Sequence, residues 1–454
     1  MRRFDPLAMI PRLPFALLAR CRIPDDLDAV TSLAPETPPE AVGLEPVAVE
    51  RIWQAAVALY RTGVHPALQL CVRRRGEIVL NRAIGHAAGN APLDSADAPR
   101  IPCTTQTPFN IFSASKAITA MVIHKLDEER QLHLEDPVCE FIPEFARHGK
   151  HRITIRHILS HRAGIPNLPP EAIDLDLLVH PERVVAILAD AKPRTRPGRL
   201  LAYHAVSGGF VLAEIVKRIT GSDVRQVLEQ RISRPLGLRW LSYGVPPADV
   251  PRVAVNAFTG PPVPLPMQLI LKNALGTTLA HAIELSNDPR YLTGIVPSAN
   301  VVTTAEELSA FYQCLLDGGS LGGVQVFDPR TVRHATAEQN HWELDFTLGM
   351  PIRYGLGFML GGAPASLYGL DNPHAFGHLG LSNVISWADP ERDLAVALLT
   401  SGKPIISTHV VRLVELMLAI SRGLPKLSPR RQWKASSSMT SMRRESAPSV
   451  LKTS

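Results

Sequence analysis

The sequence predicts an α+β fold: an antiparallel sheet built from both chain ends and flanked by helices, joined to a mostly helical second region. Strand-like apolar runs lie near both ends of the chain, and residues from about 130 to 235 show helical spacing broken by turn signals. The chain has 454 residues, 45% of them hydrophobic and 20% charged, which is enough for a large core. One α/β unit with a helical insertion accounts for this length, as would two or three smaller domains.

The elements of the N-terminal part begin after a long irregular segment. Residues 1–40 contain many prolines and show little periodicity, so we expect an N-terminal extension. Apolar side chains at helical spacing then predict a helix from about residue 46 to residue 62. Two apolar runs, Ala67–Val72 and Ile78–Ile84, flank an arginine-rich turn and predict a β hairpin.

The middle of the chain contains a short strand signal followed by helices. Phe109–Phe112 is a brief apolar run that leads into Ser113. Apolar residues then recur at helical spacing as far as Leu126, so we expect Ser113 to open a helix. The region from about residue 245 to residue 300 is apolar and rich in proline, and a helix returns at Ala305–Leu316.

The folded part of the chain is predicted to end with a hairpin and a helix. Asn383–Ala388 and Leu394–Thr400 flank a charged turn that contains proline, which is typical of a hairpin. An amphipathic helix follows and stops at Gly423, shortly before a proline. Its apolar face is expected to contain Val410, Leu413, Val414, Met417 and Leu418.

The excess positive charge lies in the last segment of the chain. Residues 425–454 are rich in Ser, Arg and Lys and predict a disordered basic tail, which leaves residues 41–424 as one folded domain. The net charge is +6 and the sequence pI is near 9.1, but seven basic residues and one acidic residue fall after residue 425. The body is therefore near neutral and lacks the basic field of a nucleic-acid-binding protein, while weak contact of the tail with a membrane surface stays open.

The cysteines and the N-terminus bear on the cellular compartment. Arg2 and Arg3 precede an apolar stretch, but Asp5 and two prolines interrupt it, so we expect no cleavable signal peptide. No run of 18 apolar residues predicts a membrane span, and a cytoplasmic location is expected, with peripheral membrane association left open. Small buried thiols in a reducing compartment are expected for the five scattered cysteines, which are Cys21, Cys71, Cys103, Cys139 and Cys314.

Ser113-Ala114-Ser115-Lys116 is the first candidate for chemistry. Residues three apart share one face of a helix, so Lys116 is expected one turn away from Ser113. A serine hydroxyl needs a base to become a nucleophile, and a lysine can be that base only where its surroundings keep it partly neutral. Taken alone, the pattern also fits a serine that caps a helix and a lysine on the surface.

Several further segments occur with this motif in a characteristic order and spacing. They are Thr107–Lys116, Leu134–Val138, Ile155–Pro166, Pro197-Gly198, Tyr203-His204-Ala205, Val302–Leu308, Tyr354–Gly357, Gly377–Gly380 and Asp389–Glu391. Through these segments the chain, from about residue 109 to residue 401, resembles the β-lactamase-like serine hydrolases. It is most similar to class C β-lactamases and the related esterases, including family VIII-type carboxylesterases, which implies the β-lactamase and transpeptidase type of fold.

The resemblance implies a role for each matching residue. Ser113 would be the nucleophile, Lys116 would hold and relay its proton, and Tyr203 would be a second base whose phenolate is stabilised by nearby cations. The backbone N–H groups of Ser113 and Leu381 would form the oxyanion hole. No cofactor is implied. Read without the resemblance, Tyr203 could equally be a core tyrosine at a turn, and His378 a strand histidine bonded to backbone.

The sequence departs from the family pattern at two positions that contact substrate. The tyrosine motif usually ends in Asn, which holds the substrate amide, whereas here it ends in Ala205. The third motif begins with His378 rather than Lys and ends at Gly380, so the fixed cation beside a β-lactam carboxylate is replaced by a side chain that is mostly neutral near pH 7. Both changes weaken recognition of an anionic amide, which favours an esterase.

Two other signals are interpreted as structural. Ser320 lies in a Gly-x-Ser-x-Gly pattern like that of lipases, but a predicted helix precedes it and further turn residues surround it, so we expect a loop serine. His151, His157 and His161 are not spaced as in zinc enzymes and have no acidic neighbours. We therefore predict no metal site.

The leading hypothesis is a metal-independent carboxylesterase that forms an acyl-enzyme at Ser113 and acts on small or medium acyl esters. The alternatives are a β-lactamase or D-amino-acid peptidase, an acyltransferase that uses an acceptor other than water, and a catalytically inactive binding homologue. The partner expected is a small-molecule ester. The apolar stretch from Pro261 to Leu285 is predicted either to line an acyl pocket or form a lid, or to be an insertion that packs on the body.

Overall fold

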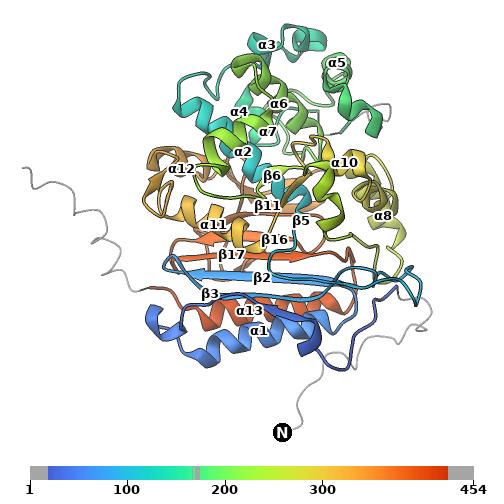
Figure 1. Ribbon diagram of the computed structural model, residues 1–454. Helices are drawn as coiled ribbons and strands as arrows, with labels where there is room; N and C mark the ends of the chain where they lie inside the picture. The colour runs from blue at the N-terminus through green and yellow to red at the C-terminus, as the bar shows by residue number, and fades with distance from the viewer. Residues whose placement is uncertain (1–18, 166, 169–173, 428–454) are drawn as a thin grey trace, which may run out of the picture.

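A large antiparallel sheet runs through the molecule (Figure 1). The computed structural model describes residues 19–165, 167–168 and 174–427. Nine strands follow the order β1-β3-β2-β17-β16-β15-β12-β11-β10, and a tenth, β4, pairs with β3. At the centre, β2 (Ala67–Arg74) from the N-terminal part pairs with β17 (Leu394–Thr400) from the C-terminal part. The sheet is thus built from both chain ends, as the predicted α+β fold requires.

Both predicted hairpins are confirmed as neighbouring strand pairs, β2 with β3 and β16 with β17. The turn of the first one contains Arg75 and Gly76 at positive φ, a conformation that glycine adopts readily. The remaining strands of the sheet are β1 (Thr31–Leu33), β3 (Glu77–Ala88), β4 (Ile101–Pro102), β10 (Asn340–Asp345), β11 (Met350–Tyr354), β12 (Met359–Leu360), β15 (Phe376–Leu379) and β16 (Ile385–Asp389).

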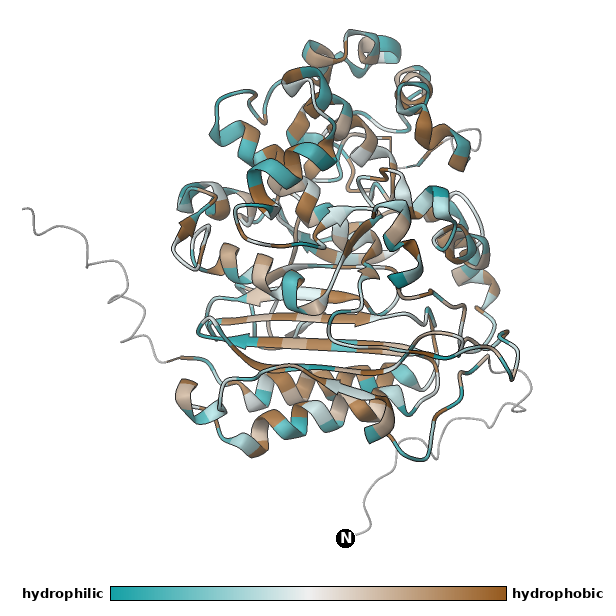
Figure 2. Cartoon of the chain, viewed as in Figure 1, coloured by the Kyte–Doolittle hydropathy of each residue, from teal (hydrophilic) through white to brown (hydrophobic). Residues whose placement is uncertain are grey.

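Two helices from opposite ends of the chain pack together on one face of the sheet. They are α1 (Pro46–Tyr60) and α13 (His409–Gly423), which lie below the sheet in Figure 1. Figure 2 shows that the strands between these helices and the rest of the molecule are largely hydrophobic. The predicted face of α13 is wrong at two positions, because Val410 and Val414 are 40% and 50% exposed. The predicted Met417 is buried, together with Leu416 and Ile420, which the predicted face does not include, since these side chains face the core that α1 and the sheet share.

The opposite face of the sheet carries α11 (Ala305–Leu316) and, behind it, the central helix α2 (Ser115–Glu128). Helix α2 is almost wholly buried, so it joins the sheet to the helical region at the top of Figure 1. The helices of this region and of the chain that follows it are α3 (Val138–Phe141), α4 (Ile155–Leu159), η8 (Leu175–Val179), α5 (Pro181–Asp190), α6 (Ser207–Thr220), α7 (Val224–Leu228), α8 (Leu265–Leu275), α9 (Leu279–Leu285), α10 (Pro289–Thr293) and α12 (Pro329–Ala335).

Short elements complete the chain. The 3₁₀ and π turns are η3 (Asp28–Val30), η4 (Pro39–Val42), η5 (Phe112–Ala114), η6 (Pro143–Arg152), η9 (Glu229–Ser233) and η10 (Pro247–Arg252). Three small sheets pair β5 (Phe109–Asn110) and β6 (Ser242–Tyr243) with β7 (Val301–Thr303), β8 (Ser320–Leu321) with β9 (Val324–Gln325), and β13 (Ala365–Ser366) with β14 (Gly369–Leu370).

The predicted extension contributes to the sheet, because β1 pairs with β3 as its edge strand. The predicted tail lies outside the described residues from position 428 onward. No pair among the five cysteines is bonded, and all but the half-buried Cys139 are buried. None of the helices in the described part of the chain combines the length and the apolar composition that a membrane crossing requires.

Candidate active site

Ser113 sits in the turn that feeds α2. The strand before it, β5, is held by β7, and Phe112 then adopts a positive φ of 49°, which is uncommon for a residue other than glycine. Ser115 fixes this turn, because its hydroxyl donates to the Phe112 carbonyl at 2.5 Å and accepts the Val301 N–H at 3.0 Å. Ser115 is fully buried and stabilises the turn through its hydrogen bonds, whereas Ser113 is partly exposed.

Lys116 lies one helical turn further on and reaches back to Ser113. Its Nζ is 3.2 Å from the Ser113 Oγ, the separation of a hydrogen bond. The same Nζ donates to the carbonyl oxygens of Ala205 at 2.6 Å and of Ser298 at 3.1 Å. The two carbonyl oxygens therefore direct the lysine at the serine, which the spacing of the motif alone predicts only in part.

The electrostatic surroundings of Lys116 favour its neutral form. The side chain is buried, and in the described part of the chain its polar contacts are with uncharged oxygens. Burial without a compensating carboxylate lowers the pKa of Lys116 well below its usual 10.5. A lysine in this state is more readily neutral than an exposed lysine and can then accept a proton.

Tyr203 covers the other side of Lys116, whose Nζ lies 4.8 Å from the centre of the tyrosine ring. Burial raises the pKa of Tyr203 above its usual range, although a hydrogen bond with the Ser113 side chain acts in the opposite direction. The nearby charge of Asp345 raises the pKa further. The phenol form of Tyr203 is therefore favoured over the phenolate that a second base would need. Lys116, the cation expected to stabilise a phenolate, has a lowered pKa and so favours its own neutral form.

Asp345 holds the segment that carries Tyr203, and sequence reasoning missed it. Its Oδ1 accepts the backbone N–H groups of Tyr203 at 3.1 Å, Thr347 at 2.8 Å and Leu348 at 3.0 Å. Its Oδ2 accepts the hydroxyl of Tyr354 at 3.3 Å. Asp345 is fully buried, so this network fixes the backbone at Tyr203 from a strand at the far edge of the sheet.

The histidines of the region pack around the tyrosine. The His161 ring lies 4.7 Å from the Tyr203 ring, and its Nδ1 accepts the backbone N–H of His204 at 3.2 Å. Burial lowers the pKa of His161 well below 6.5, so the ring is neutral. His157 caps the start of α4, and His151 is exposed. Within the described residues no three His, Cys, Asp or Glu side chains gather as metal ligands.

His378 lies on β15, where it pairs with Ser386 of β16. Its Nδ1 donates to the Leu379 carbonyl at 2.7 Å, which fixes the ring. Burial, and next to it the proximity of Lys116, lowers the pKa of His378 to about 3. The histidine is therefore uncharged, and it supplies no cation for a substrate carboxylate.

The end of β15 comes close to the turn of Ser113. Gly380 donates its N–H to the Val384 carbonyl at 2.7 Å, and a Cβ at this position would collide with the carbonyl oxygen of Ile111. A glycine is therefore needed for β15 to approach the chain two residues before Ser113. The next N–H group, that of Leu381, donates to no other backbone or side-chain group among the described residues.

A second buried lysine stands behind Phe112. The Lys403 Nζ lies 4.7 Å from the centre of the Phe112 ring and donates to the Thr400 carbonyl at 2.6 Å. Burial lowers the pKa of Lys403 to about 7. No local pattern predicts this contact, because Lys403 follows a strand and precedes a proline in an otherwise ordinary loop.

A cavity of about 150 Å³ opens beside Ser113, and most of its lining is apolar. The proline-rich stretch contributes residues of α8, of α9 and of the loop between them. The stretch thus forms part of the wall next to Ser113. The lining residues are Phe112, Ser113, Leu168, Asp174, Leu175, Leu178, Ala205, Val206, Phe210, Leu275, Thr277, Ala282, Leu285, Tyr291, Val296, Ala299 and Leu381.

Ser320, the serine of the lipase-like pattern, belongs to a separate hairpin. It begins β8, which pairs with β9, so the strand–turn–helix context of a nucleophile elbow is missing at this place. Its hydroxyl donates to the Asp317 carbonyl at 3.3 Å. The sequence predicts a loop serine, and the structure places Ser320 in a two-residue strand instead, because the following turn pairs it with β9.

Comparison with known proteins points to one family. The model of the β-lactamase family matches residues 50–418. A protein of Mycobacterium tuberculosis named esterase/beta-lactamase LipL is 30% identical over 327 residues, which cover 68% of this chain and 73% of that protein.

Solved structures agree with this assignment. A penicillin-binding protein homologue from Caulobacter crescentus has a TM-score of 0.70 at 26% identity and covers 84% of this chain and 99% of its own. A family VIII carboxylesterase has a TM-score of 0.69 at 27% identity, with 82% of this chain and 96% of that chain covered. Together with the family match over most of the sequence, these likenesses show that the chain belongs to the β-lactamase family of serine hydrolases.

Proposed function

We propose that this protein is a carboxylesterase that forms an acyl-enzyme on Ser113. The observation that carries the proposal is the 3.2 Å contact between Ser113 and a buried Lys116 whose pKa is held well below its usual value. A hydroxyl next to a neutral amine in a partly apolar cavity is the arrangement that nucleophilic catalysis requires.

The chemistry follows from the positions of the groups. Lys116 takes the proton of Ser113 while the Ser113 Oγ attacks the ester carbonyl carbon, and the C=O electron pair moves onto oxygen. The N–H groups of Ser113 and Leu381 would stabilise that oxyanion. When the intermediate collapses, the C–O bond to the alcohol breaks and the alcohol oxygen receives the proton from Lys116. Water then repeats the same steps and releases the acid.

Tyr203 would act in this scheme as a neutral phenol. Its raised pKa, and the Ser113 side chain as a neighbour that acts on that pKa, suit a protonated phenol that relays a proton rather than a phenolate. The role that the resemblance implies for Tyr203 is therefore retained in part: it relays protons, and Lys116 is the base.

An ester suits the site better than a β-lactam. Ala205 offers no side-chain hydrogen bond to an amide, and its carbonyl oxygen already accepts from Lys116. His378 is neutral and offers no charge to a carboxylate. A site without partners for buried polar groups binds them poorly. The name of one solved relative, a family VIII carboxylesterase, supports the same choice.

The test compares kcat/KM for nitrophenyl butyrate with kcat/KM for a chromogenic cephalosporin on the same preparation. We expect the ester to exceed the cephalosporin by about a hundredfold or more. Ser113→Ala is the control and should lose both activities. Faster turnover of the cephalosporin would overturn the substrate class, and ester turnover that survives Ser113→Ala would overturn the mechanism.

A further inference from the structure

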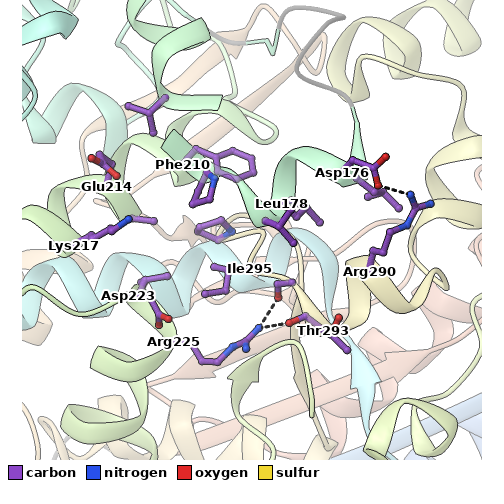
Figure 3. A pocket seen from close by; sticks show the side chains of 18 residues that line it. Asp176, Leu178, Phe210, Glu214, Lys217, Asp223, Arg225, Arg290, Thr293 and Ile295 are labelled. Carbon is purple, nitrogen blue, oxygen red and sulfur yellow. Dashed lines mark hydrogen bonds and ion pairs between the residues drawn. The ribbon is translucent and has the colours of Figure 1, made fainter. Parts of the chain in front are cut away.

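A second and larger cavity adjoins the one at Ser113. Its volume is about 360 Å³, and it lies among η8, α5, α6, α7 and α10 in the helical region. The two cavities share three lining residues, which are Leu175, Leu178 and Phe210. Figure 3 shows Leu178 and Phe210 pointing into the second cavity, with Ile295 beside them. These three apolar residues, here called the shared wall, line both cavities, which therefore adjoin each other.

The charged groups at the rim of the second cavity are mostly engaged with the protein. Arg290 pairs with Asp176 through a 2.7 Å contact, and Arg225 donates to the carbonyl oxygens of Thr293 at 2.6 Å and Gly294 at 2.7 Å (Figure 3). Arg290 is thus paired at the edge of the cavity, and Arg225 is bonded through one Nη, although its buried Nε has no hydrogen-bond partner among the described residues. Most of the polar atoms at the rim are engaged with the protein, which favours a hydrocarbon group in the interior.

Other polar residues of the rim are also accounted for. Glu214 accepts from Arg218 at 2.7 Å, and Asp223 caps α7 by accepting the Gln226 N–H at 2.9 Å. Lys217 is an exposed residue at the edge. The interior of the second cavity is lined instead by aliphatic and aromatic side chains, including Val185, Val224 and Pro297 as well as the shared wall.

The sizes of the two cavities set the length of group that each can hold. A cavity of about 150 Å³ lined by apolar side chains accommodates a benzene-sized group, on the order of six carbons. The Ser113 cavity has this volume, so a longer chain must leave it. The shared wall of Leu175, Leu178 and Phe210 leads from there into the second cavity, which is more than twice as large.

We infer that the second cavity binds the distal part of the substrate's acyl chain, so that the preferred substrates are esters of unbranched acids with about eight or more carbons. This inference rests on the acyl-enzyme proposed above. The acyl group stays bonded to the Ser113 Oγ through both half-reactions, whereas the alcohol leaves after the first. A cavity that adjoins the Ser113 site therefore contributes most when it holds the acyl side.

The inference gives a measurable dependence on chain length. Each methylene that leaves water for an apolar cavity strengthens binding by up to about fourfold. We expect kcat/KM for nitrophenyl decanoate to exceed that for the acetate by at least about tenfold, with the increase continuing beyond hexanoate. A profile that peaks at acetate or butyrate, while turnover itself is normal, would overturn this inference and leave the proposed function standing.

The matched variants place the effect in the second cavity. Ala213→Trp adds a large side chain at a residue that lines only this cavity, and it should lose about tenfold or more on decanoate while acetate turnover stays within about twofold. Ala96→Trp makes the same change at an exposed loop residue outside both cavities and should behave like the wild type. Val179→Trp, at a lining residue that is 76% exposed, replaces Ala213→Trp if that variant does not fold.

A second substrate series separates the two sides of the ester. Decyl acetate carries the chain on the alcohol, so we expect it to gain little over ethyl acetate and to be indifferent to Ala213→Trp. A gain confined to decyl acetate would overturn the inference. So would a decanoate preference that survives Ala213→Trp, or Val179→Trp where that variant replaces it. Absence of turnover with every ester, acetate included, would instead contradict the proposed function.

Discussion

The Nζ of Lys116 lies 3.2 Å from the Oγ of Ser113 and is held there by the carbonyl oxygens of Ala205 and Ser298. Helical spacing puts the lysine on the right face, but the two carbonyl groups fix its direction, and they come from parts of the chain that are far away in sequence. The same burial that holds the lysine keeps its pKa low, so position and basicity have one structural cause.

The first prediction concerns the charge of Lys116. Lys116→Met should reduce kcat/KM for an ester by about a thousandfold, because it removes the proton acceptor and keeps the aliphatic volume. In the wild type, kcat/KM should rise with pH as Lys116 loses its proton, and the rise should be complete well below pH 10.5. A pH–rate profile of the two proteins checks both statements.

The lowered pKa of Lys116 should also make the stability of the fold depend on pH. Because the pKa of Lys116 is lower in the folded state, the unfolded chain binds the extra proton between the two pKa values, and stability rises with pH in that window. The free energy of unfolding of the wild type relative to Lys116→Met should therefore increase from pH 7 towards pH 10. Lys192→Met, at an exposed lysine, is the matched control. A relative stability that is independent of pH would contradict the lowered pKa.

The second prediction concerns Asp345 as the residue that positions Tyr203. Asp345→Ala leaves three backbone N–H groups without their acceptor, which should destabilise the fold by about 3 kcal/mol and lower kcat by about a hundredfold. Asp345→Asn keeps the Oδ1 acceptor and should retain much of both quantities. Urea unfolding and ester kinetics on the two variants provide the measurement.

Tyr354→Phe is the control for that pair of variants. It removes only the hydrogen bond to Oδ2 of Asp345 and should cost about 1 kcal/mol of stability with little change in kcat. If Asp345→Ala were to unfold the protein no more easily than Tyr354→Phe does, the network would not hold the tyrosine segment.

The third prediction concerns the basic tail. Deletion of residues 430–454 removes six basic residues and one acidic residue, which lowers the net charge from +6 to +1. The chain just before the deletion stays anchored, because Lys426 pairs with Asp371 at 2.9 Å and with Glu391 at 3.0 Å. Ester kcat/KM and the unfolding midpoint should therefore match those of the full chain, while isoelectric focusing gives a pI closer to neutral. Loss of solubility or turnover would show that the tail packs on the body.

Local patterns were sufficient for much of the fold. The hairpins and helices α1 and α11 follow from alternation, helical spacing and turn residues, which act over a few positions. The face of α13 could not be predicted in the same way, because Val410 and Val414 are as apolar as the buried residues. Contact with α1 decides which side of that helix is covered.

The residues of the candidate site also differ in whether a local pattern or a long-range contact reveals them. Ser113 and Lys116 are found through a spacing of three residues, whereas Asp345 lies 142 positions from the Tyr203 amide that it binds. An isolated acidic residue in a strand has no local signature, so only the folded chain reveals its partners. The phenol form of Tyr203 is also a property of burial, which the sequence motif does not specify.

The measurement that tests the central claim most directly is the identity of the serine that carries the acyl group. The protein is incubated with a fluorophosphonate, digested, and analysed by mass spectrometry. We predict a single labelled serine, Ser113, with Ser115 and Ser320 unmodified, because among the serines of the described residues only Ser113 combines partial exposure with a side-chain contact to Lys116. Labelling should be lost in Ser113→Ala and slowed in Lys116→Met. A label on Ser320, or labelling that persists in Ser113→Ala, would contradict the account.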